Sequence, residues 1–144
     1  MSDPSSVQAV LAEWPADQEG LARAFEELTR AAAQMTQTVV EVITRLGVSH
    51  SFRAALVDPE GKRVRPVYFL VDVVVSSTDP WFLSVCYYED EITDPEELGN
   101  PVPQGLFQET GYCFDVEDYD PALLGYLRDR LAEAHARAQM SIES

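Results

Sequence analysis

Acidic residues are the side chains of this sequence whose types and spacing could support chemistry. Of the 25 Asp and Glu residues, 13 lie between Pro66 and Leu127, where there is no Lys or Arg. Two short runs stand out in that stretch, at residues 89–97 and 115–120. Clustered carboxylates are how proteins supply the roughly 6–8 oxygen ligands of Ca²⁺. One hypothesis is therefore a divalent-metal site, regulatory or hydrolytic, with ligands from Glu89, Asp90, Asp115, Glu117 and Asp118.

Neither acidic run has the order of an EF-hand loop, because the central glycine and the final bidentate glutamate are missing. Runs of charge are more often solvated surface. In that interpretation the second run also precedes the last helix, with Asp118 or Asp120 as its N-cap. We therefore predict no metal and no other cofactor, and keep a metal site formed by both runs as the alternative.

Linear catalytic motifs are missing from the sequence. It contains no GxGxxG, P-loop, HExxH or GxSxG pattern. The two histidines, His50 and His135, are far apart and belong to no recognisable Ser/His/Asp or Cys/His set. The sequence therefore favours a protein that is not an enzyme and names no catalytic residue, although many active sites carry no linear signature.

Asp72 is an acid inside the strongly apolar run from Val64 to Val75. A buried carboxylate is costly unless it is paired. Asp72 is therefore either a general acid or base with a raised pKa, or the partner of a nearby arginine. We prefer a pair with Arg53 or Arg65 on a neighbouring strand.

The net charge of −15 bears on partners and location. It would repel nucleic acid and anionic membranes. No run approaches the roughly 18 apolar residues of a membrane span, and the first residues lack a signal-peptide pattern. These features predict a cytoplasmic protein. In a reducing compartment Cys86 and Cys113 are expected to be free thiols, since they could pair only on neighbouring strands.

Two helices are predicted, one near each end of the chain. Apolar residues spaced alternately four and three apart indicate a long first helix from about Asp17 to Leu46. This helix could lie across a sheet or also pair with a copy of itself. Asp120-Pro121 starts a last helix that runs to about Met140. The stripe of the first helix consists of Leu21, Phe25, Leu28, Ala32, Met35, Val39, Val42 and Leu46.

Alternating and continuous apolar runs predict the strands. Three are expected at Val48–Val57, Val64–Val75 and Trp81–Glu89, joined by short turns as an antiparallel meander. A fourth short strand is expected at Tyr112–Val116. Residues 89–105, with three prolines, are predicted to form a long acidic loop.

These elements predict a two-layer α+β domain over residues 17–140, in the order α-β-β-β-(β)-α. The two helices would pack on one face of a 3–4 stranded antiparallel sheet. Residues 1–16 would form a loosely ordered arm and 141–144 a tail. In element order and acidity alone the chain resembles the small acidic chaperones of bacterial secretion systems.

Aromatic residues crowd the second half of the chain, and alternation places some of them on the sheet face away from the helices. An apolar centre with a polar rim is typical of protein-binding surfaces. We therefore predict a non-enzymatic interaction module, adaptor or chaperone-like, that binds a basic protein or peptide. It would form a homodimer through the first helix or a sheet edge, and a small-molecule pocket is a third hypothesis. The predicted contact residues are Phe82, Tyr88, Glu91, Glu96, Tyr112 and Phe114.

Overall fold

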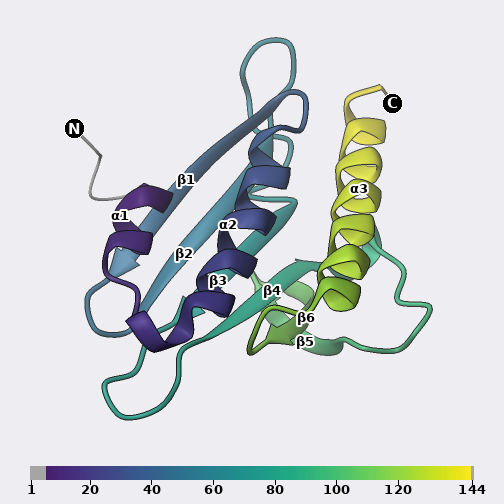
Figure 1. The fold of residues 1–144 in the computed structure, drawn as a ribbon. Coiled ribbons are helices and arrows are strands. Elements are labelled where there is room, and N and C mark those ends of the chain that lie inside the picture. Colours follow the sequence, from purple (N-terminus) through teal and green to yellow (C-terminus); the bar gives the residue numbers. More distant parts are fainter. Residues whose placement is uncertain (1–5, 144) are drawn as a thin grey trace.

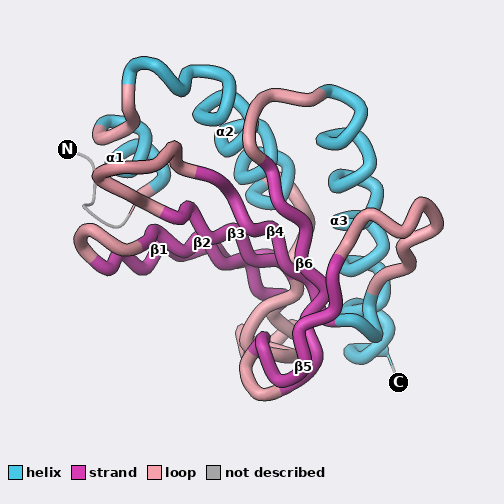
Figure 2. The backbone as a smooth tube through the Cα atoms, turned by 90° about the horizontal axis from the view of Figure 1, so that it is seen from below, coloured by secondary structure: helices cyan, strands magenta, loops and turns pink. Residues whose placement is uncertain are grey.

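The computed structural model of the protein describes residues 6–143 as a six-stranded antiparallel sheet with helices on one face (Figures 1 and 2). The helices are α1 (Val7–Ala12), α2 (Glu19–Ala33) and α3 (Pro121–Glu143), with short 3₁₀ turns η1 (Ala16–Gln18) and η2 (Glu89–Glu91). The strands are β1 (Thr38–Arg45), β2 (Ser49–Leu56), β3 (Phe69–Val74), β4 (Phe82–Tyr88), β5 (Asn100–Leu106) and β6 (Glu109–Val116). The predicted α+β class is confirmed, and the sheet has six strands where three or four were expected.

The strands lie in the order β1-β2-β3-β4-β6-β5, and every neighbouring pair is antiparallel. β6 pairs with β4, so the β5–β6 hairpin leaves β5 at one edge of the sheet and β1 at the other. Pairing aligns one row of side chains across five strands, and all of them belong to the main core. The row consists of Val42, Phe52, Val71, Val85 and Phe114.

Helices α2 and α3 bury their apolar stripes against that same face of the sheet, as the views in Figures 1 and 2 agree. Their buried anchors are Leu21, Phe25 and Leu28 on α2 and Leu124, Leu127 and Leu131 on α3. The Tyr87 hydroxyl lies within this core and donates to the Leu127 carbonyl at 2.7 Å. The polar end of this buried tyrosine is therefore satisfied by α3, which ties β4 to that helix.

A second, smaller apolar cluster lies on the sheet face without helices, beneath the β5–β6 hairpin. It consists of Val67, Leu70, Cys86, Tyr88 and Leu106. At the tip of the hairpin Phe107 reaches as far as β2, where the Arg53 guanidinium lies 5.4 Å from its ring centre. The hairpin therefore covers part of the face that the sequence analysis left open.

The predicted helix from Asp17 to Leu46 is wrong in its second half. Helix α2 ends at Ala33, and Gln37 has a φ of 54° that breaks the helical path. The following β1 is rich in β-branched residues, which restrict χ1 and favour strands over helices. Only the first four residues of the predicted stripe lie on a helix, so a heptad seam for self-pairing does not exist.

The predicted acidic loop at residues 89–105 is also wrong in part, because it contains η2 and most of β5. Pro101 and Pro103 argued against a strand there. They are tolerated because β5 is an edge strand, where a missing N–H need not interrupt a ladder. The pairing of β5 with β6 is irregular between Val102 and Leu106, as expected for such a sequence.

The predicted loose arm differs from the structure over residues 6–16. Helix α1 begins after Ser6, whose hydroxyl accepts from the Ala9 N–H at 3.1 Å, and it buries Val10. Trp14 then packs on Phe25 and Trp81, with ring centres 5.5 and 5.2 Å apart. Residues 1–5 and 144 of the predicted arm and tail lie outside the described residues, and α3 continues through most of that tail. None of the described helices is both long and apolar enough to cross a membrane.

Candidate functional site

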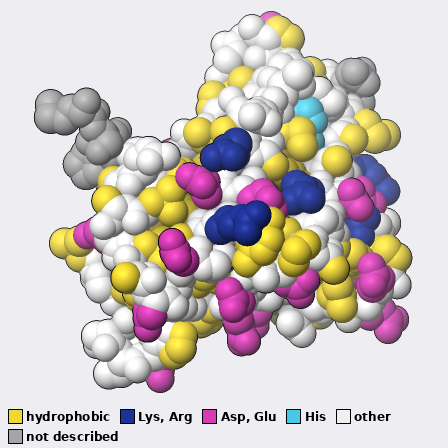
Figure 3. Space-filling model, viewed as in Figure 1, with side chains coloured by type: hydrophobic (Ala, Val, Ile, Leu, Met, Phe, Trp, Pro, Cys, Tyr) yellow, Lys and Arg dark blue, Asp and Glu magenta, His cyan; other side chains and the backbone are white. Residues whose placement is uncertain are grey.

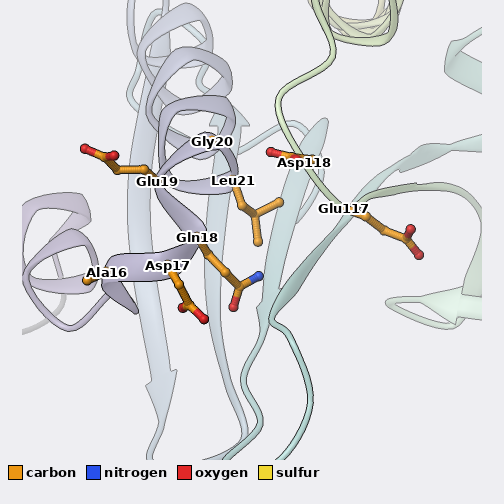
Figure 4. A pocket seen from close by; sticks show the side chains of 8 residues that line it. All are labelled: Ala16, Asp17, Gln18, Glu19, Gly20, Leu21, Glu117 and Asp118. Atoms are coloured by element: carbon orange, nitrogen blue, oxygen red, sulfur yellow. The ribbon is translucent and has the colours of Figure 1, made fainter.

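An acidic hollow of about 400 Å³ opens between the start of α2 and the segment that joins β6 to α3 (Figure 4). Asp17 comes from η1 and Glu19 from the first turn of α2, whereas Glu117 and Asp118 come from the second segment. Among residues 6–143 no Lys or Arg lines the hollow. The described residues that line it are Ala16, Asp17, Gln18, Glu19, Gly20, Leu21, Glu117 and Asp118.

Local sequence explains how these two distant segments meet. The Gln18 side chain binds the Trp81 backbone in both directions, donating to its carbonyl at 2.9 Å and accepting from its N–H at 2.9 Å. This fixes η1 against the start of β4. Gly20 removes the side chain that would otherwise block the approach, because a Cβ there would overlap the Asp118 carboxylate. The glycine near the start of the helix therefore has a packing reason.

The β6–α3 segment is held by a helix cap. Asp120 accepts from the N–H groups of Ala122 and Leu123 at 3.1 and 3.2 Å. This is the N-cap arrangement that Asp-Pro predicts. Glu117 and Asp118 precede the cap, so they project from a connection whose two ends are both fixed.

The carboxylates of the hollow are uncompensated. Asp17, Glu19 and Glu117 make no hydrogen bond or ion pair within residues 6–143, and Asp118 accepts only from the adjacent Tyr119 N–H at 2.7 Å. The positive end of the α2 dipole offsets only part of this negative charge, about half an elementary charge against four carboxylates. Two of the four acids come from another segment and add to that charge. The hollow is therefore a place where positive charge is favoured.

The helix-covered face has a different electrostatic character. Figure 3 shows basic side chains near its middle, with acidic side chains around them. Arg128 pairs with Glu27 at 2.7 Å, and the Arg23 guanidinium lies 4.1 Å from the Tyr119 ring centre. Charges on this face are largely paired with one another, whereas those of the hollow are not.

The predicted aromatic contact residues do not form one face. Phe82 and Tyr88 lie on the face without helices, and Phe114 lies on the helix face opposite Val85. Tyr112 is half-buried and packs on Phe114, with ring centres 5.8 Å apart. Tyr88 and Phe114 are each only 1% exposed, so neither offers a surface to a partner.

The predicted acidic contact residues are also separated. Glu96 is exposed in the loop after η2, and its backbone N–H donates to the Tyr126 hydroxyl at 3.2 Å. Glu91 is 5% exposed and lies 3.3 Å from Arg65. Glu91 is therefore part of an internal ion-pair network and not of a rim.

That network is centred on Arg65. Its guanidinium donates to Asp90 and to Glu109, each at 2.9 Å, and lies 4.0 Å from the Tyr88 ring centre. Hydrogen bonding to Arg65 lowers the pKa of Asp90, whereas burial raises the pKa of Glu91 to about 7. Glu91 Oε1 and the Tyr88 hydroxyl are buried and have no hydrogen-bond partner among the described residues. Burial therefore outweighs the attraction of Arg65 at Glu91.

We expect Glu91 to make the protein less stable as the pH rises. Its pKa is about 7 in the folded chain, against a usual value of 4.5. The folded state therefore holds the proton more tightly, and its contribution is complete below 4.5 and lost as the pH rises through 7. Allowing for screening by solvent, we expect the loss to be about 2 kcal/mol.

Urea unfolding of wild type and Glu91→Gln at pH 5 and pH 8 measures this contribution. Glutamine cannot ionise, so the fall in unfolding free energy between the two pH values should be smaller in the variant by about 2 kcal/mol. Equal falls in both proteins would show that Glu91 ionises normally. Thr110→Ser, in a residue that also borders Arg65, serves as a control without charge change.

The ligands of the alternative metal site are not brought together. Glu89 and Asp90 follow β4, whereas Asp115, Glu117 and Asp118 lie at the end of β6. Because Leu83 pairs with Val116 and Tyr88 with Gly111, these are opposite ends of two antiparallel strands. Within residues 6–143 no group of three or more His, Cys, Asp or Glu is placed to hold a metal ion.

The predicted pairing of Asp72 is wrong. Asp72 lies on the face without helices, opposite Ser51 and Ser84, and forms no ion pair with any described residue. Arg65 is occupied by the network above, and Arg53 donates to the Ser51 hydroxyl at 3.1 Å. Asp72 is half-buried and so avoids the full cost of a buried unpaired carboxylate.

Both histidines have structural partners. His50 Nδ1 is 2.9 Å from the Thr44 hydroxyl, which joins β2 to β1. His135 Nε2 is 2.8 Å from the Thr36 carbonyl, which joins α3 to the segment before β1. His50 therefore links two paired strands, and His135 links α3 to a segment 99 positions earlier in the chain.

Cys86 and Cys113 form a disulfide, so the prediction of free thiols is wrong. They lie directly opposite each other on β4 and β6, with Cα atoms 4.2 Å apart. The sequence could not reveal this pairing, because β5 lies between β4 and β6 along the chain but occupies the edge of the sheet.

Comparisons with known proteins found no matching family, no similar curated protein and no similar solved structure. The site must therefore be judged on its own geometry. The sequence predicts Glu117 and Asp118 as possible metal ligands and Asp17 only as the start of the first helix, and it gives no signal for Glu19. No local signal joins residues about 100 positions apart. The one sequence hint is Gly20, whose place in the first turn of a helix is otherwise unfavourable.

Proposed function

We propose that the protein is a non-enzymatic interaction module that binds a basic segment of another protein at the acidic hollow. The observation that carries this proposal is a depression lined by four acidic residues, none of them paired with a base among residues 6–143; in Figure 4 Asp118 points toward Gly20, whereas Glu19 and Glu117 point outward on opposite sides. A lysine or arginine side chain of a partner would supply the missing charge. Steering by the remaining negative charge of the chain would raise the association rate.

The chemistry of the lining favours a charged polypeptide segment over a small apolar ligand. Small-molecule sites are mostly apolar, with a few polar groups that orient the ligand. Here the side chains of Ala16 and Leu21 are the apolar part of a lining otherwise made of acids, an amide and a glycine. An extended basic segment can place one side chain in the hollow and others along its rim.

This proposal keeps the predicted basic partner and moves the contact surface. The buried Tyr88 and Phe114 cannot anchor a partner. The proposed surface instead contains Glu117 and Asp118, which the sequence suggested as binding residues only in the alternative metal site, together with Asp17 and Glu19. Exposed rim charges of this kind act mainly on association rate and salt dependence.

The test uses a fluorescent peptide of alternating lysine and alanine, titrated at about 0.1 M salt. We expect the variant Asp17→Asn/Glu19→Gln/Glu117→Gln/Asp118→Asn to bind the peptide about tenfold more weakly, because it removes the local charge. The matched control is Glu60→Gln/Glu89→Gln/Glu96→Gln/Glu97→Gln. It changes the net charge equally at exposed positions elsewhere.

The affinity of the control variant for the peptide should fall by less than about threefold, since charges far from the binding site are screened over roughly 10 Å at moderate salt. Raising the salt should reduce the difference between the two variants. If both variants lose affinity equally, the peptide senses only net charge and the hollow is not a site. Gly20→Ala, which displaces the Asp118 carboxylate without changing charge, should also weaken binding.

A further inference from the structure

Exposed apolar side chains gather at the β1 edge of the sheet, apart from the acidic hollow. Val39, Val40 and Ile43 on β1 are 39%, 46% and 40% exposed. Leu46 and Val48, in the turn to β2, are 87% and 57% exposed. Natural edge strands are usually protected by prolines, bulges or charges because they otherwise pair with other chains. The eight residues of β1 include neither proline nor bulge.

The backbone of this edge is ready to accept another strand. The Gln37 carbonyl accepts from the Val57 N–H at 2.8 Å, which sets the alternation of hydrogen bonds along β1. Odd-numbered residues from Val39 to Arg45 therefore bond to β2. The even-numbered residues turn their N–H and C=O groups outward, and β1 is the terminal strand of the sheet. These residues are Thr38, Val40, Val42 and Thr44.

We infer that this edge binds a second copy of the chain, with β1 antiparallel to its counterpart and Ile43 on the two-fold axis. In that register Glu41 lies opposite Arg45 of the other copy, and the pair occurs twice by symmetry. Ile43 meets its own counterpart between the two charge pairs. On the other face Val40 lies opposite Leu46 of the other copy, which covers two of the most exposed apolar side chains.

Charge distinguishes this register from the others that the outward hydrogen bonds permit. Centring the pair on Glu41 would place two glutamates opposite each other, which is unfavourable. Centring it on Val42 would place Glu41 opposite Ile43 of the other copy. Arg45 forms no ion pair within the described chain, and Glu41 is held beside the edge by Arg63 at 3.1 Å. An unpaired cation therefore faces a positioned anion across the axis.

The consequence is a continuous twelve-stranded sheet with the helices of both copies on one face. Since the two β1 strands run in opposite directions, the two acidic hollows would lie at opposite ends of the assembly. The β1 edge shares no residue with the acidic hollow, so a test of dimerisation does not depend on the proposed function.

Charge reversal tests the register. Light scattering at about 50–200 µM should give twice the chain mass for the wild type. Glu41→Arg and Arg45→Glu alone each create two like-charge pairs and should weaken dimerisation about tenfold or more. The double variant Glu41→Arg/Arg45→Glu restores opposite charges across the axis and should restore most of the dimer, since the like charge that it places beside Arg63 is largely solvated. The double variant contains both substitutions. If it dimerises, neither substitution prevents folding, and the single variants must lose the dimer through like-charge repulsion across the axis.

Cross-linking tests the axis. Ile43→Cys should form a disulfide between copies under mild oxidation, since facing residues in a non-hydrogen-bonded pair have Cβ atoms about 4.5–5.5 Å apart. The control is Val39→Cys, which lies on the same strand and face with 39% exposure against 40% for Ile43, but faces Gly47 of the other copy in this register. A monomeric wild type, an unaffected dimer in both single charge variants, or equal cross-linking of the two cysteine variants would overturn the inference.

Discussion

Replacing Phe114 by alanine is expected to lower the free energy of unfolding by about 4 kcal/mol. Phe114 is 1% exposed and sits at the end of the row of core side chains that crosses five strands. Its ring contacts Tyr87 and Tyr126, with centres 5.9 and 6.1 Å apart. Tyr87 and Tyr126 cannot move into the space left by the ring without breaking the hydrogen bonds of their hydroxyl groups. The loss therefore combines lost burial with a remaining cavity.

Phe82→Ala is the matched control for Phe114→Ala. Phe82 belongs to the adjacent β4 but is half-buried on the face without helices. We expect a loss of about 1–2 kcal/mol, because less apolar surface is buried there. Urea unfolding of both variants measures the difference. Equal losses would mean that the helix face and the opposite face contribute equally to the core, contrary to the packing described above.

Replacing Arg65 by methionine is expected to cost about 3 kcal/mol of unfolding free energy at pH 8. Arg65 is the only counter-charge within 4 Å of the buried Glu91 in the described chain, and it also lies on the Tyr88 ring. Without it, Glu91 must either ionise unpaired or take up a proton from solution at pH 8. Both alternatives cost free energy in the folded state and not in the unfolded one.

The cost of Arg65→Met should be smaller at pH 5. Glu91, with a pKa of about 7 in the folded chain, is already protonated there and needs no counter-charge. The remaining cost comes from the cation–π contact and the exposed pairs with Asp90 and Glu109, together about 1–2 kcal/mol.

Adding a second substitution separates the charge from the packing. Arg65→Met/Glu91→Met removes the unpaired acid, and we expect it to recover most of the loss at pH 8, since apolar side chains often replace buried ion pairs without penalty. Urea unfolding at the two pH values measures all three proteins. A loss in Arg65→Met that is the same at pH 5 and pH 8 would mean that Glu91 is not the residue left uncompensated.

The local sequence pattern correctly predicted the central strands and the start of the last helix. β3 and β4 lie within the predicted strands, because apolar residues at nearly every position fit a central strand covered on both faces. The start of α3 was also predicted, since Asp120-Pro121 specifies a helix N-terminus through its own hydrogen bonds. These features depend on neighbours within a few residues, which a sequence displays directly.

What the sequence could not determine is which face each residue turns toward, and what covers that face. Val39 and Val42 fit a helical spacing as well as a strand, and only pairing with β2 makes them a strand. The sequence predicts Tyr88 as an exposed aromatic residue, whereas in the structure the β5–β6 hairpin covers it.

The sequence by itself determined the fold class, the central strands, the last helix and the excess of acid between Pro66 and Leu127. The tertiary structure alone decided the Cys86–Cys113 bond, the burial of Glu91 and the acidic hollow. Each of these joins segments whose separation along the chain carries no local signal. Periodicity is a property of neighbouring residues, whereas burial and charge pairing depend on which distant segments the packing brings together.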